Sequence, residues 1–447
     1  MSILEDIKPD LVLSMYTTHW GFTRSLPKSK AGFDIMDLAR TVNMFGTEVM
    51  TRNVMKSSRA LLPLRKMKNI ITKEYGTRLW GIYYTNDWES TYFAWCVANM
   101  CGQSAIMAFN MPPNAPAFRD FAKTEGNMQV TGAENVAEIG LLFSTASKDW
   151  NKSIGFENGL FGMAQQLEAL HIPYEMVGDI SLRPEILSKY KVLSLGTSAC
   201  MSDEQVNAVL DFAEKGGTLH LLGVTALCDE TGEMRRQWPF AKIFGFRPDY
   251  YSKWKLAECD SVKFEHPART FVKPGTVNPM QEIRPYGKGH IIYQATDAGA
   301  YLYTMEKTAG DKWPYERYPI LEKFYREYLA NLLKDVRVWN TNAPDKVFTA
   351  LWKEADGSLV IHFLNATGEN NKKGEVLDGL APKPAFPALP EDIIFSIKCA
   401  NAKSVTAASP SFGGIRALQY KAQDDGTIEV TLPADLAKQY VVVRIRE

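Results

Sequence analysis

The sequence between residues 136 and 222 constrains the fold most, because short apolar runs alternate there with longer amphipathic segments. The apolar runs predict buried strands. They are VAEIGLLF (136–143), YEMV (174–177), KVLSL (191–195) and TLHLL (218–222). The segments between them have apolar residues at helical spacing, as in FENGLFGMAQQLEAL (156–170). Strands that alternate with helices predict a parallel sheet with helices on both faces.

Local signals mark the ends of several helices in this segment. Ser202, with Gln205 three residues later, has the pattern of a capping box. The helix that follows should end at Gly216–Gly217, since glycine is the usual residue just beyond a helix. Ser181 is a candidate cap for a short helix over 184–190. Further along, GKGHIIYQATD predicts a turn that enters a strand, and residues 318–333 predict a long amphipathic helix.

The flanking blocks differ in pattern. Up to about residue 125 we again expect strands and helices in alternation. The expected strands are Leu11–Thr17, Phe33–Leu38, Leu79–Tyr84 and Ser104–Phe109, and the expected helices are Leu61–Tyr75 and Glu89–Met100. From about Val336 the pattern becomes strand-like, and FTALWKEADGSLVIHFLN (348–365) predicts a hairpin with Ala-Asp-Gly at its turn. Together with IIFSIKC, TIEVTLP and YVVVRIR, this block predicts a small antiparallel sandwich.

Composition excludes several function classes. The 447 residues include 51 Lys plus Arg and 51 Asp plus Glu, so the formal net charge is zero. Such a balance gives no electrostatic reason to expect nucleic acid or a membrane as partner. The N-terminus does not resemble a signal peptide, and no run of about 18 apolar residues occurs, so we expect a cytoplasmic chain. The six cysteines are too few for a disulfide scaffold.

No cofactor or metal site is expected. The sequence has neither a dinucleotide fingerprint nor a phosphate-binding loop. Its six histidines do not pair at metal-ligand spacing, and His220 and His362 lie inside strand runs, where we expect satisfied core residues. Cys200 follows a strand and precedes a helix, but it lacks the flanking glycines of a nucleophile elbow. We interpret it as an inert loop cysteine.

The first block holds the polar and aromatic residues of most interest. Acids mixed with Trp and Tyr at the carboxyl ends of parallel strands are typical of carbohydrate sites in βα-barrels. The candidate catalytic residues are Asp87, Glu89, Glu48 and Asp37, and the candidate substrate-binding residues are His19, Trp20, Tyr83, Tyr84, Asn86 and Trp88. The alternative is that these acids are solvated loop residues or helix caps, as Asp87 or Glu89 could be for the helix that follows.

Several segments resemble one family. EIGLLFSTAS to GTLHLLG (138–223) resembles the middle, trimerisation domain of glycoside hydrolase family 42 β-galactosidases. The string YGKGHIIYQATD, the helix after it and LVIHFLNATG look like the end of that domain and the C-terminal β domain. WGIYYTNDWESTYFAWCVANMCGQSAIMAFN (80–110) looks like strand seven, helix seven and strand eight of the catalytic barrel.

The resemblance implies an α/β fold in three parts. Residues 1–125 would form the last βα units of a partial TIM barrel, and 126–335 a flavodoxin-like, doubly wound domain. That domain type is related to class I glutamine amidotransferases but lacks their catalytic cysteine. Residues 336–447 would form a C-terminal antiparallel β-sandwich. Since the family's nucleophile usually follows strand seven, the resemblance points to Asp87 or Glu89.

The chain also departs from this family. A complete barrel needs about 200–250 residues, whereas only about 115–125 precede the second block. The family's general acid/base usually follows strand four, and that half of the barrel has no counterpart here. A conventional glycosidase requires two carboxylates. We therefore expect a homo-oligomer, or a partner chain that completes the barrel.

These inferences leave three function classes. The first is a carbohydrate-active protein that hydrolyses O-glycosidic bonds by paired carboxylates, with His19, Trp20 and Tyr84 contacting the sugar. The second is a non-catalytic sugar-binding or assembly protein descended from such a hydrolase. A thiol enzyme centred on Cys200 is the third.

Overall fold

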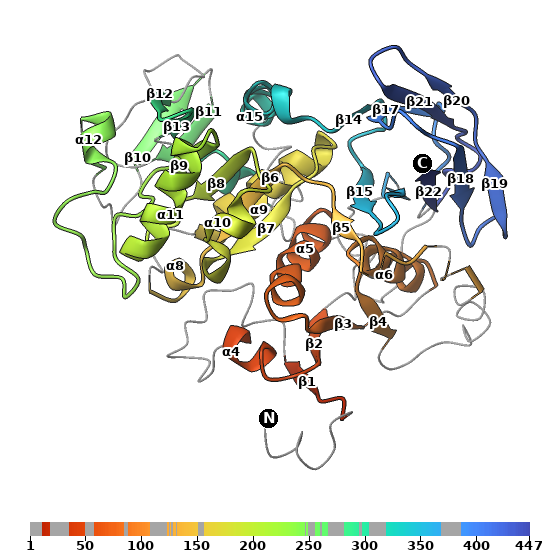
Figure 1. Ribbon diagram of the computed structural model, residues 1–447, viewed down its shortest axis with the longest axis horizontal. Coiled ribbons are helices and arrows are strands. Elements are labelled where there is room, and N and C mark those ends of the chain that lie inside the picture. Colours follow the sequence, from red (N-terminus) through yellow and green to blue (C-terminus); the bar gives the residue numbers. More distant parts are fainter. Residues whose placement is uncertain are drawn as a thin grey trace.

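The computed structural model describes most of the chain. The described residues are 11–17, 35–49, 58–84, 88–107, 123–124, 126, 128–130, 132–150, 156–245, 247–248, 255–259, 262–266, 281–294, 297–303, 319–367 and 386–447. In Figure 1 the strands of the first block lie below, the central sheet lies at upper left and the C-terminal strands at upper right. Among the described residues, no helix is long and apolar enough to cross a membrane.

The first block forms a four-stranded parallel sheet in the order β1-β2-β3-β4. Its strands are β1 (Ser14–Thr17), β2 (Met44–Val49), β3 (Arg78–Tyr83) and β4 (Ser104–Met107), and its helices are α4 (Ile35–Ala39), α5 (Ser58–Tyr75) and α6 (Trp88–Met100). The described strands form an open sheet and not a closed barrel. The strand expected at Phe33–Leu38 is wrong, because residues 35–39 form α4 and bury Ile35 and Ala39 at helical spacing.

Helix α5 is buried between two sheets. Its residues Met67, Ile70 and Ile71 pack in one core with Phe45 of β2 and with Leu141 of the central sheet. Helix α6 has a similar place beside the C-terminal strands, where Phe93 meets Phe348 edge to face. The two helices therefore connect the first sheet with both other parts of the molecule (Figure 1).

The central sheet has six strands in the order β12-β13-β9-β8-β6-β7. All neighbours pair in parallel except β12 and β13. The strands are β6 (Ile139–Phe143), β7 (Glu175–Gly178), β8 (Val192–Gly196), β9 (Thr218–Leu222), β12 (Gln281–Tyr286) and β13 (Gly289–Gln294). The helices are α8 (Thr145–Trp150), α9 (Phe156–Ala169), η1 (Asp179–Ser181), α10 (Pro184–Leu187), α11 (Asp203–Glu214), α12 (Ala241–Phe244), α13 (Gly299–Leu302), α15 (Pro319–Leu332) and η2 (Lys334–Val336). A separate antiparallel pair joins β10 (Lys255–Cys259) and β11 (Val262–His266).

The end signals of α11 are confirmed. Ser202 Oγ accepts from the Gln205 backbone N–H at 3.1 Å, and Gln205 Oε1 accepts from the Ser202 N–H at 2.9 Å. Gly216 has φ 119°, which an L side chain adopts only with strain. The cap expected at Ser181 is wrong, because Arg183 occupies the N-cap of α10. Ser181 Oγ instead accepts from the Gly178 N–H at 3.3 Å and donates to Glu74 of α5.

The C-terminal part consists of two antiparallel sheets with a shared apolar core. The strands of the smaller sheet, in order, are β14 (Trp339–Thr341), β17 (Ile393–Lys398), β21 (Thr427–Leu432) and β20 (Tyr420–Ala422). Those of the larger sheet are β19 (Ile415–Ala417), β18 (Ser404–Ala408), β22 (Tyr440–Arg446), β16 (Leu359–Asn365), β15 (Val347–Lys353) and β5 (Glu134–Asn135). The expected hairpin is present as β15 and β16. The molecule thus combines parallel α/β sheets with antiparallel β structure.

Candidate functional site

The first sheet has two faces of different character. Thr47 of β2 faces α5, where its hydroxyl accepts from Lys68 and, at 3.4 Å, from Arg65. Since side chains alternate along a strand, Glu48 lies on the opposite face. We call this opposite face, which also carries Ser14, Tyr16, Gly46, Trp80 and Tyr84, the inner face. It is partly open to solvent, and Tyr16 is 43% exposed.

Glu48 is held by two phenols. The hydroxyl of Tyr84, just after β3, donates to Glu48 Oε1 at 2.5 Å, and the hydroxyl of Tyr16 from β1 donates to the same atom. Partial desolvation of its hydroxyl and the hydrogen bond to Glu48 raise the pKa of Tyr16, and the hydrogen bond to Glu48 raises that of Tyr84. Both phenols therefore keep their protons at neutral pH. Residues from three neighbouring strands meet here at their carboxyl ends.

An aromatic platform, formed by the rings of Tyr16 and Trp80, lies on the inner face beside Gly46, two residues before Glu48 on β2. The rings of Tyr16 and Trp80 stack with centroids 6.0 Å apart and planes inclined by 16°. Gly46 pairs with both residues across the sheet, and a Cβ at position 46 would lie 2.1 Å from Trp80 Cζ2. The indole can lie over β2 only because residue 46 has no side chain. Trp80 Nε1 donates to Ser14 Oγ at 3.3 Å, which orients the ring.

The structure brings some predicted site residues together and separates others. Glu48 and Tyr84 meet, whereas Tyr83 is fully buried on the other face, 5.4 Å below the Arg65 guanidinium. Asp37 lies on α4 with its side chain 61% exposed and 3.5 Å from Arg40. Trp88 and Glu89 begin α6, but the structure describes only their backbone and not their side chains. His19, Trp20, Asn86 and Asp87 lie outside the described residues.

Sequence reasoning missed two members of this site. The sequence predicts strands over 11–17 and 79–84, but its pattern singles out neither Tyr16 nor Trp80 as a site residue. Strand β2 itself was not predicted. A period-two reading of MFGTEV would have placed Glu48 and Gly46 on one face and Phe45 and Thr47 on the other.

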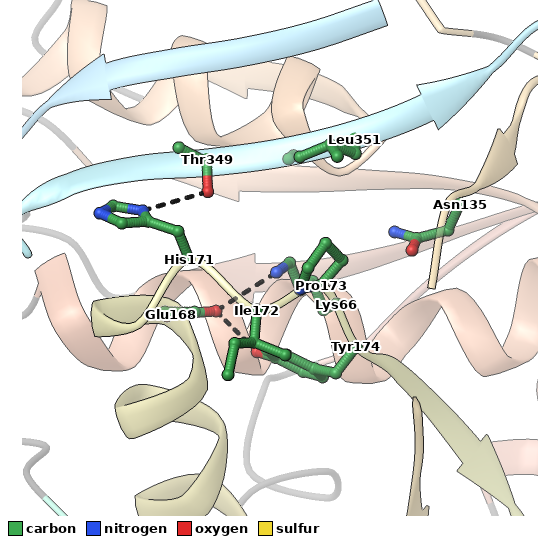
Figure 2. Close-up of a pocket in the computed structure, with 10 residues that line it drawn as sticks. Lys66, Asn135, Glu168, His171, Ile172, Pro173, Tyr174, Thr349 and Leu351 are labelled. Carbon is green, nitrogen blue, oxygen red and sulfur yellow. Dashed lines mark hydrogen bonds and ion pairs between the residues drawn. The ribbon is translucent and has the colours of Figure 1, made fainter. Parts of the chain in front are cut away.

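A second polar cluster lies where the three parts of the chain meet (Figure 2). Glu168 lies 3.5 Å from the ammonium of Lys66 and accepts from the Tyr174 hydroxyl at 2.6 Å. His171 Nε2 bonds the carbonyl of Ala343 at 2.8 Å, and Thr349 lies 3.4 Å from His171 Nδ1. The cavity between these residues has a volume of about 10 Å³. That is room for about one water molecule, so this cluster joins parts of the chain and is too small for a substrate.

The remaining candidates have structural partners. His220 is fully buried between Ser194 Oγ at 3.0 Å and the Tyr328 hydroxyl at 3.2 Å, and His362 bonds the Tyr440 hydroxyl at 2.6 Å. Both lie in the core, as expected, and His220 has partners at both ring nitrogens, whereas His362 Nε2 is buried without a hydrogen-bond partner among the described residues. Within the described part of the chain, no group of His, Cys, Asp or Glu could hold a metal ion.

No protein-family profile and no curated protein sequence matches this chain. Solved structures do. The β-galactosidase Gan42B of family GH42 from G. stearothermophilus, solved as a catalytic mutant, aligns over 99% of this chain and 65% of its own, with TM-score 0.63 and 12% identity. The chain has a GH42-like fold. The β-galactosidase from Bacillus circulans sp. alkalophilus gives the same coverage and identity with TM-score 0.62.

Other glycoside hydrolases share parts of this fold. An α-L-fucosidase isoenzyme from Paenibacillus thiaminolyticus aligns over 83% of this chain and 61% of its own, with TM-score 0.54 and 17% identity. The chain therefore spans less than two thirds of the length of the solved structures that it resembles.

Proposed function

We propose that this chain is a carbohydrate-active protein whose sugar site lies on the inner face of the first sheet. One observation carries the proposal: Glu48, held by Tyr16 and Tyr84, lies beside the stacked rings of Tyr16 and Trp80. An aromatic ring can stack on the apolar face of a pyranose, while a carboxylate accepts hydrogen bonds from sugar hydroxyls. The names of the solved structures that share the fold support this class of ligand.

The same proposal covers the domain organisation. Residues 1–125 would be the last units of a βα-barrel, 126–335 a flavodoxin-like domain related to the amidotransferases, and 336–447 a β-sandwich. The parallel order of β1 to β4 supports the first assignment. The second assignment is supported by the order of the parallel strands, β7-β6-β8-β9-β13. When these five strands are numbered along the chain, the order is 2-1-3-4-5, which is the order of flavodoxin-like sheets. The shared core of the two antiparallel sheets supports the third.

A second half-barrel would complete the site. Among the described residues, strands β1 and β4 are the outer strands of the first sheet. An exposed parallel edge leaves backbone donors and acceptors without strand partners. We propose that a second copy of this chain or a separate barrel-forming chain covers these edges. The protein's native mass, measured alone and with the product of the adjacent reading frame, tests this: a stable monomer that binds neither would contradict it.

Hydrolysis would need a second carboxylate. Glu48 is the one acidic residue in the strands β1 to β4. Asp87 and Glu89, which follow β3 in the sequence, remain our proposals for a nucleophile or base, with His19, Trp20, Asn86 and Trp88 as further sugar contacts. The alternative, a non-catalytic sugar-binding or assembly protein, is favoured by the single carboxylate of these strands.

The test is a titration of the protein with aryl β-galactosides and α-fucosides. Calorimetry measures their binding, and release of the aryl group measures their hydrolysis. Binding should weaken about tenfold or more in Glu48→Gln, since a hydrogen bond to a charged group contributes about 1.5–3 kcal/mol. Asp37→Asn, on exposed α4, is the matched control and should bind as the wild type does. Aryl release that depends on Glu48 would establish an enzyme, and saturable binding without release would establish the alternative. Absence of any binding, alone and with the completing chain, would overturn the proposal.

A further inference from the structure

Two cysteines distant in sequence lie side by side at the carboxyl edge of the central sheet. Cys200 follows β8 and Cys228 follows β9, and the two residues form an isolated parallel bridge. The Cys228 N–H donates to the Ala199 carbonyl at 2.8 Å, and the Met201 N–H donates to the Cys228 carbonyl at 3.2 Å. Paired residues on neighbouring strands have backbones about 4.8 Å apart. That separation lies within the Cα spacing of roughly 4.4–6.8 Å found in disulfides.

Both cysteines are buried, Cys200 being 0% exposed and Cys228 2%. Since paired residues of neighbouring strands point to the same side, the two thiols lie next to each other. Two other described thiols have different neighbours: that of Cys96 interacts with Tyr92, and that of Cys399 donates to Glu447 at 3.3 Å. Cys200 and Cys228 are therefore arranged as a pair.

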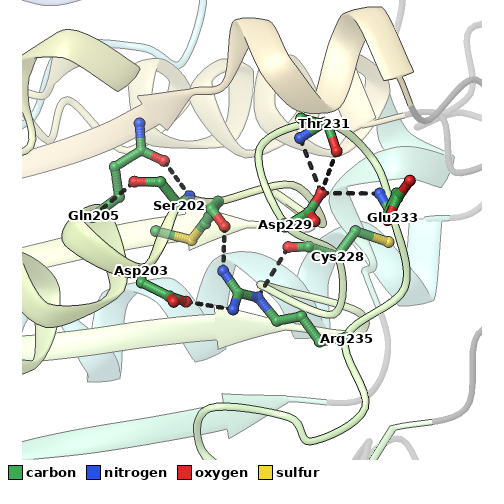
Figure 3. A network of polar contacts seen from close by, with 9 residues as sticks. Ser202, Asp203, Gln205, Cys228, Asp229, Thr231, Glu233 and Arg235 are labelled. Atoms are coloured by element: carbon green, nitrogen blue, oxygen red, sulfur yellow. Dashed lines mark hydrogen bonds and ion pairs between the residues drawn. The ribbon is translucent and has the colours of Figure 1, made fainter.

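Arg235 holds both backbones in place (Figure 3). Its Nε donates to the Cys228 carbonyl at 3.3 Å and its Nη2 to the Met201 carbonyl at 2.6 Å, while Nη1 pairs with Asp203. From the other side, Ser147 Oγ accepts from the Cys200 N–H at 3.0 Å. With both backbones fixed, a bond between the sulfurs requires only side-chain rotation.

The surroundings make the two thiols unequal. Interaction with the Cys200 thiol, together with the Arg235 and Arg247 guanidiniums, lowers the pKa of Cys228. Interaction with Cys228 and burial raise the pKa of Cys200. Because the thiolate is the nucleophile of thiol–disulfide exchange, Cys228 attacks first, and Cys200 resolves the mixed disulfide once it has lost its proton.

A short polar turn follows Cys228 in the chain. The Asp229 carboxylate accepts from the N–H groups of Thr231 at 2.9 Å and Glu233 at 3.0 Å, and Thr231 and Glu233 are exposed. Local opening of a surface turn needs less free energy than global unfolding, and opening here would give a small reagent access to Cys228.

We propose that Cys200 and Cys228 are a reversible thiol–disulfide site that reacts with low-molecular-weight disulfides such as oxidised glutathione. The Cys228 thiol first gives its proton to water, and the thiolate then attacks one glutathione sulfur as the S–S bond of oxidised glutathione breaks. The other glutathione leaves as a thiolate and takes up a proton from water. Cys200 sulfur then attacks Cys228 sulfur, and the second glutathione leaves with the Cys200 proton. The two protein thiols are oxidised to one disulfide, and one glutathione disulfide is reduced to two thiols.

The experiment uses the folded, full-length chain in buffers of graded reduced and oxidised glutathione. After acid quenching and alkylation, peptide mass mapping should find Cys200 joined to Cys228, lighter by two hydrogen atoms, and dithiothreitol should reverse the change. Oxidised protein should also have a higher urea midpoint than reduced protein, because the cross-link restricts the unfolded chain.

Three variants distinguish this mechanism from general thiol oxidation. Cys200→Ser should leave Cys228 as a stable mixed disulfide with glutathione, and Cys228→Ser should leave Cys200 unmodified. Cys399→Ser is the matched control and should form the disulfide as the wild type does. The proposal is overturned if folded wild-type protein keeps both thiols alkylatable in the most oxidising buffer, or if the cross-link forms only after denaturation.

Discussion

Thr47 and Glu48 are adjacent on β2, but their side chains lie on opposite faces of the first sheet because side chains alternate along a strand. Thr47 turns toward the cations of α5, and Glu48 turns toward the phenols of the inner face. The first contact belongs to the core and the second to the candidate site. A single strand thus separates a buried cationic layer from a partly open carboxylate, and Gly46 on the same strand admits the Trp80 ring.

Gly46→Ala should disrupt the aromatic platform while leaving the sheet intact. The new methyl would overlap the Trp80 ring, so the indole must leave its position against Tyr16. We expect a changed near-UV circular dichroism signal and sugar affinity reduced about tenfold, the loss of roughly one aromatic contact. Asp37→Asn, the control outside this face, should leave both the near-UV signal and the affinity unchanged. An unchanged near-UV signal in Gly46→Ala would contradict the stacked geometry.

At the scale of single elements, the start of helix α11 is determined by hydrogen bonds between residues three positions apart. Ser202 and Gln205 satisfy each other's backbone N–H groups at the start of α11, whose apolar side packs under the central sheet. The turn after α11 then leads directly into β9. This helix is positioned by its own sequence as well as by its packing.

Ser202→Ala should lower the free energy of unfolding by about 1 kcal/mol, the usual contribution of an N-cap hydroxyl. Urea titration followed by circular dichroism measures the change. Ser202→Thr keeps the hydroxyl and should recover most of the loss. Equal destabilisation by both substitutions would show that packing, not capping, is the contribution of this residue.

At the scale of the whole molecule, buried charges join parts distant in sequence. Lys66 of α5 pairs with Glu168 of α9, and their side chains are only 9% and 4% exposed. The Lys66 ammonium also lies 4.2 Å from the centre of the Tyr174 ring. This contact, with the cluster of Figure 2, connects the first block to the central one.

Glu168→Gln should destabilise the protein by about 3 kcal/mol, because it leaves a buried ammonium without its counter-charge. Lys66→Met combined with Glu168→Gln should be less destabilised than the sum of the two single variants. A double-mutant cycle from urea unfolding gives the coupling energy. Strict additivity would mean that the two side chains do not interact in solution.

Acid should destabilise the molecule partly through His362. Burial lowers the pKa of this fully buried residue to about 3, whereas an unfolded histidine has a pKa of about 6.5. Between these values the unfolded chain binds the extra proton, so the free energy of unfolding falls as pH falls. The slope from this group reaches about 1.4 kcal/mol per pH unit. Asp297, whose pKa burial raises to about 6, contributes with the opposite sign.

His362→Gln removes the destabilisation by acid that comes from His362. The free energy of unfolding of this variant should therefore improve relative to that of the wild type as pH falls from about 6.5 to 3. Chemical denaturation at several pH values measures the difference. His290→Gln, at an exposed position, should retain the wild-type dependence. A His362→Gln curve parallel to that of the wild type would contradict the burial argument.

Much of the secondary structure followed from local patterns, and the failures have physical causes. Strands β6, β7, β8, β9 and β13 of the central sheet and the hairpin of β15 and β16 follow from apolar runs and turn residues that coincide there, whereas β12 has no such signal. The strand expected at 33–38 is wrong because a short apolar run has no clear period, and α4 forms over 35–39. The cap at Ser181 failed because its hydroxyl bonds with Gly178 and Glu74 instead.

The sequence by itself determined the alternation of strands and helices, the ends of α11, the absence of net charge and the place of Tyr84 at the end of an expected strand. These features depend on residues a few positions apart. Tertiary structure alone decided that Tyr16, Glu48, Trp80 and Tyr84 share one face, and that Cys200 meets Cys228. Those contacts depend on which strands become neighbours and in which register, and that choice is made by long-range packing of the whole chain.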